Sequence, residues 1–290
     1  MTSVLITGGT GYTGRRLLQR LVATGQHVRV LVRGTSDVAL LPPQVEIVRG
    51  DLEDVSSLGS ALVGVRSIFH LAHVRFSANL LQAVSLDAKS HDAVEQIIVV
   101  SSLRALSRIR SVTVDEVLAA EATVAAAGVP WTILRPSMIF GEGDDRNISR
   151  LVERIRRGAW IPGIGGGCLH QPVFVDDVVA AILASAVLPV ARGRIYAIAG
   201  ARALTWDELV TTVGDILGKS PRVLPMPAGA VARLLALIET TGLSLPIRAE
   251  QVQRMLDDKA YDITPAREDL GYRPHTFRAA LERIHAPPGS

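Results

Sequence analysis

The sequence predicts a doubly wound α/β fold, in which helices cover both faces of a parallel sheet. Short runs rich in β-branched residues alternate with longer runs of helical periodicity over the first half of the chain. The short runs are predominantly apolar, as expected for strands that are buried on both faces of a parallel sheet. The predicted strands are 4–7, 28–32, 45–48, 67–71, 97–100 and 131–134, and the predicted helices are 15–23, 55–62, 79–88 and 115–127.

After Arg135 the alternation loosens into connections rich in glycine and proline, and the helical patterns continue at 148–157, 178–188, 206–217 and 228–239. We therefore expect a core formed by 1–145 plus 172–200, and a small C-terminal annex on the substrate side, formed by 146–171 plus 201–290. The Leu- and Ala-rich pattern at 228–239 favours core packing. An apolar pocket wall, a dimer face and a contact with a membrane surface are its alternatives.

The composition excludes several classes of protein. Because 48% of the 290 residues are hydrophobic, we do not expect a disordered chain. The 31 basic and 28 acidic residues are scattered along the chain, so we do not expect a nucleic-acid groove. Cys168 is the single cysteine and no Cys/His cluster has the spacing of zinc ligands, so we expect no disulfide and no metal. The longest apolar stretch, 178–191, falls short of the roughly 20 residues of a transmembrane helix. Because the N-terminus lacks a signal-peptide pattern, we expect a cytoplasmic protein.

A glycine-rich turn follows the first predicted strand and opens the first predicted helix. Gly8 allows a tight turn, Gly11 lets the backbone approach a pyrophosphate, and Gly14 lets the helix pack closely on the strand. The helix N-terminus presents free N–H groups to an anion. Spacing and context together predict a dinucleotide-binding turn of the Rossmann type. Its intervening residues, Thr10, Tyr12 and Thr13, are therefore also expected to contact the cofactor.

The residue after the second strand bears on the choice of cofactor. An NAD-selective site usually places a carboxylate there to accept a hydrogen bond from the ribose 2′-hydroxyl, but this chain has Arg33. Arginine cannot accept that bond, whereas it can pair with a 2′-phosphate and stack on adenine. We therefore expect NADP, with Arg15 as support, and keep NAD as an alternative. A solvated arginine at a strand end is the structural alternative for Arg33.

Six further segments follow the turn in order: Gly50-Asp51-Leu52, 68–72, 99–102, 134–141, 171–178 and 269–274. Together with the turn they resemble motifs of the short-chain dehydrogenase/reductase superfamily. The similarity is greatest to its extended and atypical branches, which include epimerase/dehydratase-like and NmrA-like proteins. The resemblance implies a Rossmann core, and it implies cofactor contacts for Asp51, Leu52, Leu71, Ala72, Ser101 and Pro136.

The resemblance also implies a catalytic tyrosine, with a lysine four residues later, on the helix after the serine strand. With Glu121 and 128–131 as register marks, we expect this dyad at Val114 and Leu118, neither of which can transfer a proton. No other register supplies the pair, because the chain has no tyrosine between Tyr12 and Tyr196 and no lysine between Lys89 and Lys219. We therefore expect an atypical member without the YxxxK dyad.

Other polar residues are candidates for the site. Ser102 could hydrogen-bond a carbonyl and His73 could titrate near neutrality, so we expect these two as catalytic residues. The structural alternatives are that the serines satisfy backbone groups at the strand end, and that His73 is an ordinary loop histidine. We expect substrate contacts from Arg75, Arg104, His170 and Gln171.

These observations favour an NADP(H)-dependent oxidoreductase that acts on a small or lipid-like carbonyl or quinone. One alternative is an NADP(H)-sensing regulatory or assembly protein without catalysis, motivated by the missing dyad. Another is an epimerase- or dehydratase-like enzyme with displaced acid and base residues. The expected partners are a small, possibly apolar, substrate and a second copy of the chain in a homodimer.

Overall fold

The computed structural model describes residues 3–87, 94–143, 145, 147–164, 167–227, 229, 233, 235, 237–238 and 257–285. Most of the helix predicted at 228–239 lies outside the described residues, as does the last residue of the helix predicted at 79–88.

The central sheet has seven strands, and every neighbouring pair in it is parallel. The strands lie in the order β11-β6-β5-β4-β1-β2-β3. From β1 the chain adds β2 and β3 on one side and then β4, β5, β6 and β11 on the other, which confirms the doubly wound class. Six strands were predicted from the sequence, and the seventh, β11, was not. The strands are β1 (Ser3–Thr7), β2 (His27–Val32), β3 (Glu46–Arg49), β4 (Val65–His70), β5 (Gln96–Val100), β6 (Trp131–Pro136) and β11 (Arg194–Ile198).

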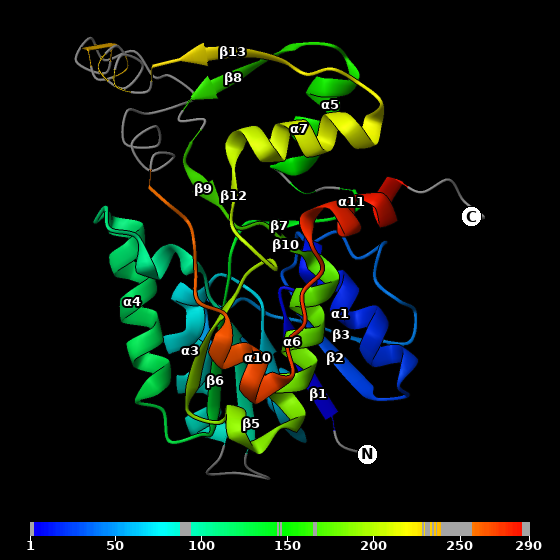
Figure 1. Ribbon diagram of the computed structural model, residues 1–290. Helices are drawn as coiled ribbons and strands as arrows, with labels where there is room; N and C mark the ends of the chain where they lie inside the picture. The colour runs from blue at the N-terminus through cyan, green and yellow to red at the C-terminus, as the bar shows by residue number, and fades with distance from the viewer. Residues whose placement is uncertain are drawn as a thin grey trace.

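Helices cover both faces of the sheet, each over its own hydrophobic cluster. One face carries α1 (Tyr12–Ala23), α6 (Val175–Val187) and α10 (Thr264–Leu270), while the other carries α2 (Gly59–Leu62), α3 (Ser77–Asp87) and α4 (Val112–Ala125). Figure 1 shows α3 and α4 on one side of the sheet and α1 and α6 on the other. Short 3-10 turns are η1 (Val55–Leu58), η2 (Val74–Phe76), η3 (Leu103–Leu106) and η4 (Pro189–Ala191).

A third hydrophobic cluster lies at one end of the sheet, the annex side (Figure 1), and it includes Phe140 and Phe174 from the predicted core, while α10 from the predicted annex packs on the sheet. It is formed around α5 (Ile148–Arg156), α7 (Trp206–Leu217) and α11 (Phe277–His285), and Phe140 packs edge-on against Phe277 within it. Thr205 and Glu208 form a capping box that begins α7, and Gly218, at φ +61°, ends it. The strands of this part are β7 (Ile139–Phe140), β8 (Trp160–Ile164), β9 (Leu169–His170), β10 (Val173–Phe174), β12 (Leu204–Thr205) and β13 (Arg222–Met226).

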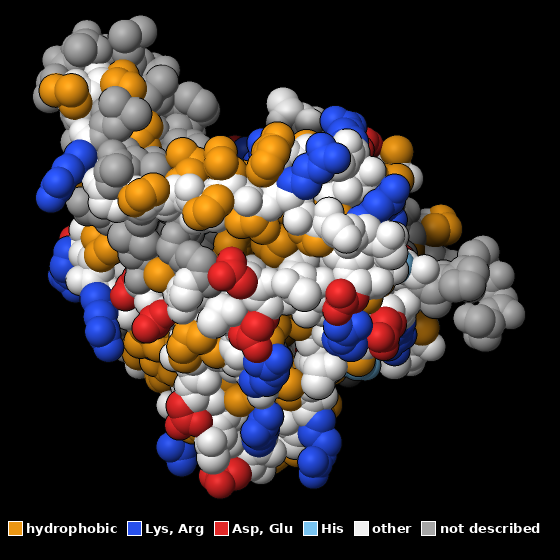
Figure 2. Space-filling view, turned by 45° about the horizontal axis from the view of Figure 1, so that its top comes forward, with side chains coloured by type: hydrophobic (Ala, Val, Ile, Leu, Met, Phe, Trp, Pro, Cys, Tyr) orange, Lys and Arg blue, Asp and Glu red, His pale blue; other side chains and the backbone are white. Residues whose placement is uncertain are grey.

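The surface of the annex side is partly apolar. Figure 2 shows hydrophobic side chains gathered across the upper middle of this face, with Lys, Arg, Asp and Glu side chains mainly below and around them. Within the described parts of the chain, no helix combines the length and the apolar character that crossing a membrane requires.

Candidate functional site

The turn between β1 and α1 has the geometry of an anion cradle. Gly8 has φ +74°, and a Cβ there would lie 2.6 Å from the backbone N of Ala72 and the backbone C of Leu71, so only glycine fits. The Gly11 N–H donates to Gly8 O at 3.0 Å and closes the turn. Helix α1 has no side-chain cap at Gly11 and no acidic residue in its first turn. Its first N–H groups are therefore available to a phosphate, and the turn fits a dinucleotide.

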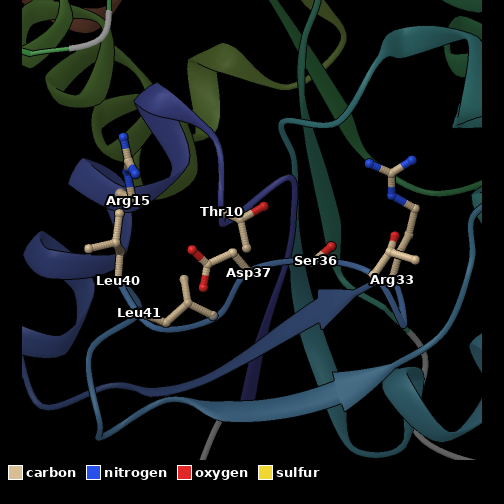
Figure 3. Close-up of a pocket in the computed structure, with 8 residues that line it drawn as sticks. Thr10, Arg15, Arg33, Ser36, Asp37, Leu40 and Leu41 are labelled. Atoms are coloured by element: carbon tan, nitrogen blue, oxygen red, sulfur yellow. The ribbon is translucent and has the colours of Figure 1, made fainter.

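A first cavity of about 310 Å³ lies beside this turn, at the end of β2. Figure 3 shows Arg15, on α1, and Arg33, after β2, on opposite sides of Thr10, Ser36 and Asp37. Neither arginine side chain pairs with a carboxylate of the described residues. Asp37 Oδ1 instead accepts from the backbone N–H of Ala39 at 2.9 Å. The cavity thus offers two unpaired guanidinium groups and nearby hydroxyls to a negatively charged group. The remaining lining residues are Thr35, Leu40 and Leu41.

A second cavity, of about 420 Å³, lies along the other side of the turn, where β4, β5 and β6 end. Its walls are mainly apolar, with a few hydroxyl groups, and none of the described residues that line it is acidic. The lining residues are Gly8, Gly11, Tyr12, Thr13, Gly14, Leu71, Ala72, His73, Val74, Val100, Ser101, Ser102, Arg104, Thr113, Val117, Pro136 and Ile139. The structure therefore brings most of the predicted cofactor residues, together with Ser102, His73 and Arg104, into one hollow.

The hydroxyl of Ser101 belongs to a buried polar network. Ser101 Oγ donates to Glu121 Oε1 at 2.5 Å, and Arg135 Nε donates to the same oxygen at 3.0 Å. Glu121 is 4% exposed and comes from α4, whereas Ser101 follows β5 and Arg135 lies on β6. The network fixes the helix against two strand ends at the wall of the second cavity. The sequence pointed to Ser101 as a cofactor contact and to Glu121 as a register mark, but it did not indicate that Ser101, Glu121 and Arg135 form one network.

Ser102 and His73 each cap a short turn while lining the cavity. Ser102 Oγ accepts from the backbone N–H of Arg104 at 3.2 Å, and His73 Nδ1 accepts from that of Arg75 at 3.3 Å. An imidazole that accepts at Nδ1 carries its proton at Nε2 when neutral. One atom of each side chain, Ser102 Oγ and His73 Nδ1, therefore satisfies a backbone N–H group. The Ser102 proton and the other ring nitrogen of His73 are left for the cavity.

Helix α4 presents a different pair of residues from the one expected. Thr113 and Val117 line the cavity, whereas Val114 and Leu118 do not. Val114 is 1% exposed, and Leu118 packs against the hydrophobic cluster on the α3 and α4 face. Residues 113, 117 and 121 share one stripe of the helix because they are four residues apart. The cavity lining therefore favours a register that is shifted by one residue from the expected one, and Thr113 and Val117 are cavity residues that the sequence did not point to.

His70 fixes the end of β4 beside the glycine turn. Its Nδ1 lies 2.7 Å from Thr7 Oγ1, and its Nε2 has no partner among the described residues. Complete burial lowers the pKa of His70 to about 4, and the nearby His73 makes a smaller contribution in the same direction. His70 is therefore a neutral internal residue. It holds Leu71 and Ala72 against the turn rather than taking part in proton transfer.

Five residues expected at the site line neither cavity, and the first three of them are Asp51, Leu52 and Arg75. Leu52 packs into a hydrophobic cluster, and its carbonyl accepts from Asn79 Nδ2 at 2.8 Å. The backbone N–H of Asp51 donates to Ser57 Oγ at 2.9 Å. The guanidinium of Arg75 pairs with Glu53 at 3.4 Å and lies over the ring of Phe76. Arg75 therefore stabilises the surface between η2 and the loop after β3 instead of facing the cavity.

His170 and Gln171 also have structural partners. Gln171 is 5% exposed, its Nε2 donates to Gly200 O at 2.7 Å, and its Oε1 accepts from the Tyr261 N–H at 2.7 Å. Both ends of the Gln171 amide therefore join backbone segments, and its expected contact with a substrate stays a prediction. His170 packs edge-on against Trp206, and burial lowers the pKa of His170 to about 4. Neither residue lines the second cavity.

Fold and turn together define a Rossmann-type dinucleotide-binding protein, with a cofactor cradle between two cavities. A family model described as NAD(P)H-binding matches residues 8–157. The chain belongs to this family, within the extended branch of the short-chain dehydrogenases/reductases, as the resemblance predicted. The chain spans about 60% of the length of the Arabidopsis thaliana relative described below.

Two curated proteins and one solved structure are similar to the chain over most of its length. It is 28% identical to NADH dehydrogenase (ubiquinone) 1 alpha subcomplex subunit 9, mitochondrial, of Arabidopsis thaliana, over 77% of this chain and 60% of that protein. It is 27% identical to 2-alkyl-3-oxoalkanoate reductase of Stenotrophomonas maltophilia, over 98% of each chain. The crystal structure of Thermus thermophilus UDP-glucose 4-epimerase with NAD superposes with a TM-score of 0.72 at 20% identity, over 98% of this chain and 99% of that one. The last similarity shows the shared fold.

Proposed function

We propose that this protein is an NADP(H)-dependent reductase of a lipid-like carbonyl or quinone compound. The observation that carries the proposal is the pair of cavities on the two sides of the glycine turn. One cavity has two unpaired arginines, and the other has apolar walls with hydroxyl groups. When bound, the cofactor supplies a hydride from its nicotinamide ring. The residues of the chain bind it, orient the carbonyl and keep water out of the second cavity.

The preference for NADP rests on Arg33 and Arg15. Both line the first cavity, where the adenosine end of a dinucleotide held by the turn would lie. Guanidinium groups bind a phosphate through charge-assisted hydrogen bonds and cannot accept a bond from a ribose hydroxyl. Asp37 lines the same cavity and is the group that would favour the NAD alternative.

A lipid-like substrate is supported by the apolar residues at the second cavity. Val74, Val100, Val117 and Ile139 contribute to its walls. Leu106 and Val112, which are 52% and 76% exposed, lie near Arg104 and Thr113 in the chain, on η3 and at the start of α4. Exposed apolar side chains beside a cavity favour a substrate with an aliphatic tail. The Stenotrophomonas maltophilia relative is named as a reductase of 2-alkyl-3-oxoalkanoates.

Stopped-flow measurement of NADPH oxidation tests the proposal. The substrates are 2-decanone, 3-oxodecanoate and decylubiquinone, and short-chain acetone serves as the matched control without a tail. We expect oxidation of NADPH with at least one long-chain compound and little with acetone. Tight binding of NADPH without oxidation by any of the three would contradict the proposal.

The second candidate is a protein that binds NADP(H) for regulation or assembly without turnover. It is favoured by Thr113 and Val117, because the stripe of α4 along the cavity holds neither a tyrosine nor a lysine. The Arabidopsis thaliana relative is named as a subunit of NADH dehydrogenase. The same stopped-flow panel separates the candidates, since this one predicts binding of NADPH with no oxidation.

A further inference from the structure

We propose that Thr113 donates the hydrogen bond that a substrate carbonyl oxygen receives in the second cavity, and that Ser101 acts there only as an acceptor. This inference rests on the proposed reductase function and names the residue that orients its substrate. It reverses the simplest expectation, in which a serine at the end of β5 donates to the carbonyl.

The proton of the Ser101 hydroxyl is already committed. It points to Glu121 Oε1 at 2.5 Å, and the Glu121 carboxylate, paired with Arg135, accepts hydrogen bonds but donates none. Ser101 therefore keeps only its lone pairs for the cavity that it lines. It can accept from an amide or hydroxyl group of a bound molecule, and it cannot donate to a carbonyl oxygen without breaking a buried, charge-assisted bond.

The hydroxyl of Thr113 is in the opposite situation. Threonines inside helices commonly donate to the carbonyl four residues back, as Thr123 does to Ala119 O at 3.0 Å. Because α4 begins at Val112, Thr113 lies in the first turn and has no helical carbonyl behind it. Its side chain has no hydrogen-bond partner among the described residues, and it lines the cavity half-buried. Its proton is thus free for a bound oxygen.

The stripe of α4 places these two groups apart. Thr113, Val117 and Glu121 follow one another by single helical turns, and Glu121 contacts Ser101. Thr113 therefore lies about 12 Å along the helix axis from Glu121, with Val117 between them. A molecule that bonds to Ser101 and a carbonyl that bonds to Thr113 occupy different parts of the cavity. This separation suits a cofactor beside the turn and a substrate toward the annex.

The other possible donors differ from Thr113 in position. Tyr12 and Thr13, which also line the cavity, lie at the start of α1 beside the glycine turn, on the side where the dinucleotide would bind. His73 and Arg104 are exposed at the rim, and Ser102 Oγ is held at the start of η3 by the backbone N–H of Arg104. Reduction adds a hydride from the cofactor to the carbonyl carbon and a proton from water to the oxygen, which gives an alcohol and oxidised cofactor. Thr113 keeps its proton and stabilises the negative charge that develops on the oxygen.

Thr113→Val removes the hydroxyl at nearly constant shape, and Thr113→Ser keeps it. Thr123→Val is the matched control, since Thr123 is exposed on the same helix and lines neither cavity. With 2-decanone we expect Thr113→Val to lower kcat about 100-fold. The Kd for NADPH should not change, and Thr113→Ser and Thr123→Val should stay within about threefold of the original protein. An unchanged kcat in Thr113→Val would overturn the proposal.

A spectroscopic measurement tests the hydrogen bond without turnover. 2-Decanone with ¹³C at the carbonyl is bound to the protein with NADP⁺, and its C=O stretch is recorded by infrared difference spectroscopy. A donated hydrogen bond lowers the stretching frequency, so Thr113→Val should raise it and Thr123→Val should not. Equal frequencies in all three proteins overturn the proposal. If the ketone binds but NADPH is not oxidised, the reductase function fails while the frequency still decides the role of Thr113. A protein that binds no ketone overturns both.

Discussion

The buried carboxylate of Glu121 accepts from Arg135 Nε at 3.0 Å, and this ion pair joins α4 to β6 beneath the second cavity. The side chains of Glu121 and Arg135 are 4% and 15% exposed, so removal of one charge leaves the other poorly solvated. We expect Glu121→Gln to lower the free energy of unfolding by about 3 kcal/mol or more. Urea denaturation monitored by circular dichroism measures this change.

Asp115→Asn is the matched control for this prediction. Asp115 lies on the same helix as Glu121 and pairs with Arg110, which precedes the helix, at 2.7 Å; the side-chain exposures of Asp115 and Arg110 are 55% and 71%. An exposed pair contributes at most about 1 kcal/mol, because water screens it. Equal losses in the two variants would show that burial does not set the strength of the Glu121 pair.

Gly8→Ala should abolish cofactor binding as well as destabilise the fold. The left-handed backbone of Gly8, at φ +74°, alone would cost an alanine about 1 kcal/mol. The added Cβ would also collide with the backbone of Leu71 and Ala72 and displace the turn. We expect the Kd for NADPH, measured by fluorescence titration, to rise more than tenfold.

Gly25→Ala controls for the backbone strain in that experiment. Gly25 has φ +72°, and a Cβ there would meet no atom within 4 Å. It should lose a similar free energy of unfolding through its φ angle while keeping the Kd for NADPH. A normal Kd in Gly8→Ala would show that the turn tolerates the collision.

Arg33→Ala should reduce selectivity for NADPH over NADH. A charged hydrogen bond to the 2′-phosphate contributes roughly 1.5 to 3 kcal/mol, so we expect the Kd for NADPH to rise about 10- to 100-fold. The Kd for NADH should change little, because it carries no 2′-phosphate. Arg20→Ala, an exposed change in the last turn of α1, is the control. Equal weakening of both cofactors would instead assign Arg33 to stacking on adenine.

The alternation of patterns was enough to predict six strands of the sheet and the bounds of α7 to the residue. The strand β11 was not predicted because Arg194 and Ile195 are exposed at the sheet edge, and its run of buried apolar residues is too short to indicate a strand. The glycine turn was predictable because its glycines are required by local geometry, namely a tight turn and close approach of the backbone to a ligand or a neighbouring strand. The polar network of Ser101, Glu121 and Arg135 was not, since residues from three elements meet only in the folded chain.

The dyad register failed for a related reason. Helical periodicity identifies a stripe of residues, but a shift of one position turns a side chain by about 100°. That rotation separates Val114, in the core, from Thr113, at the cavity. The packing of α4 against α3, η2, η3 and β6 fixes the phase.

Stability should fall in mild acid because of His70. Burial holds the pKa of folded His70 at about 4, against 6.5 in the unfolded chain. The unfolded state therefore takes up a proton below pH 6.5 and the folded state does so only near pH 4. The contribution is fully present above pH 6.5 and is lost as the pH falls to 4, by up to about 3 kcal/mol.

His70→Asn, which keeps an acceptor near Thr7 Oγ1 but does not titrate, should flatten the pH dependence of unfolding between pH 6.5 and pH 4. Urea titrations at half-unit steps of pH compare the two proteins. His170→Asn serves as a parallel case, because burial also lowers the pKa of His170 to about 4. An unchanged slope in His70→Asn would mean that other groups control the acid response.

Restoring the missing dyad distinguishes the two helical registers directly. Thr113→Tyr with Val117→Lys places a phenol on the cavity wall with an ammonium group one helical turn away. The nearby positive charge should lower the pKa of the introduced tyrosine by about 1 unit or more from its ordinary value of about 10. Ultraviolet titration of tyrosinate absorbance measures that pKa, and Thr113→Tyr alone is the control without the charge.

The same substitutions shifted by one residue, Val114→Tyr with Leu118→Lys, should behave differently. A phenol at position 114, which is 1% exposed, overpacks the core, whereas position 113 is half-buried at the cavity. We expect the shifted variant to unfold at a lower urea concentration and to gain no reductase activity. The 113/117 variant should reduce 2-decanone faster than the original protein, by a factor on the order of 100, because a tyrosine of lowered pKa supplies the proton. Better activity or a lower tyrosine pKa in the 114/118 variant would restore the register expected from the sequence.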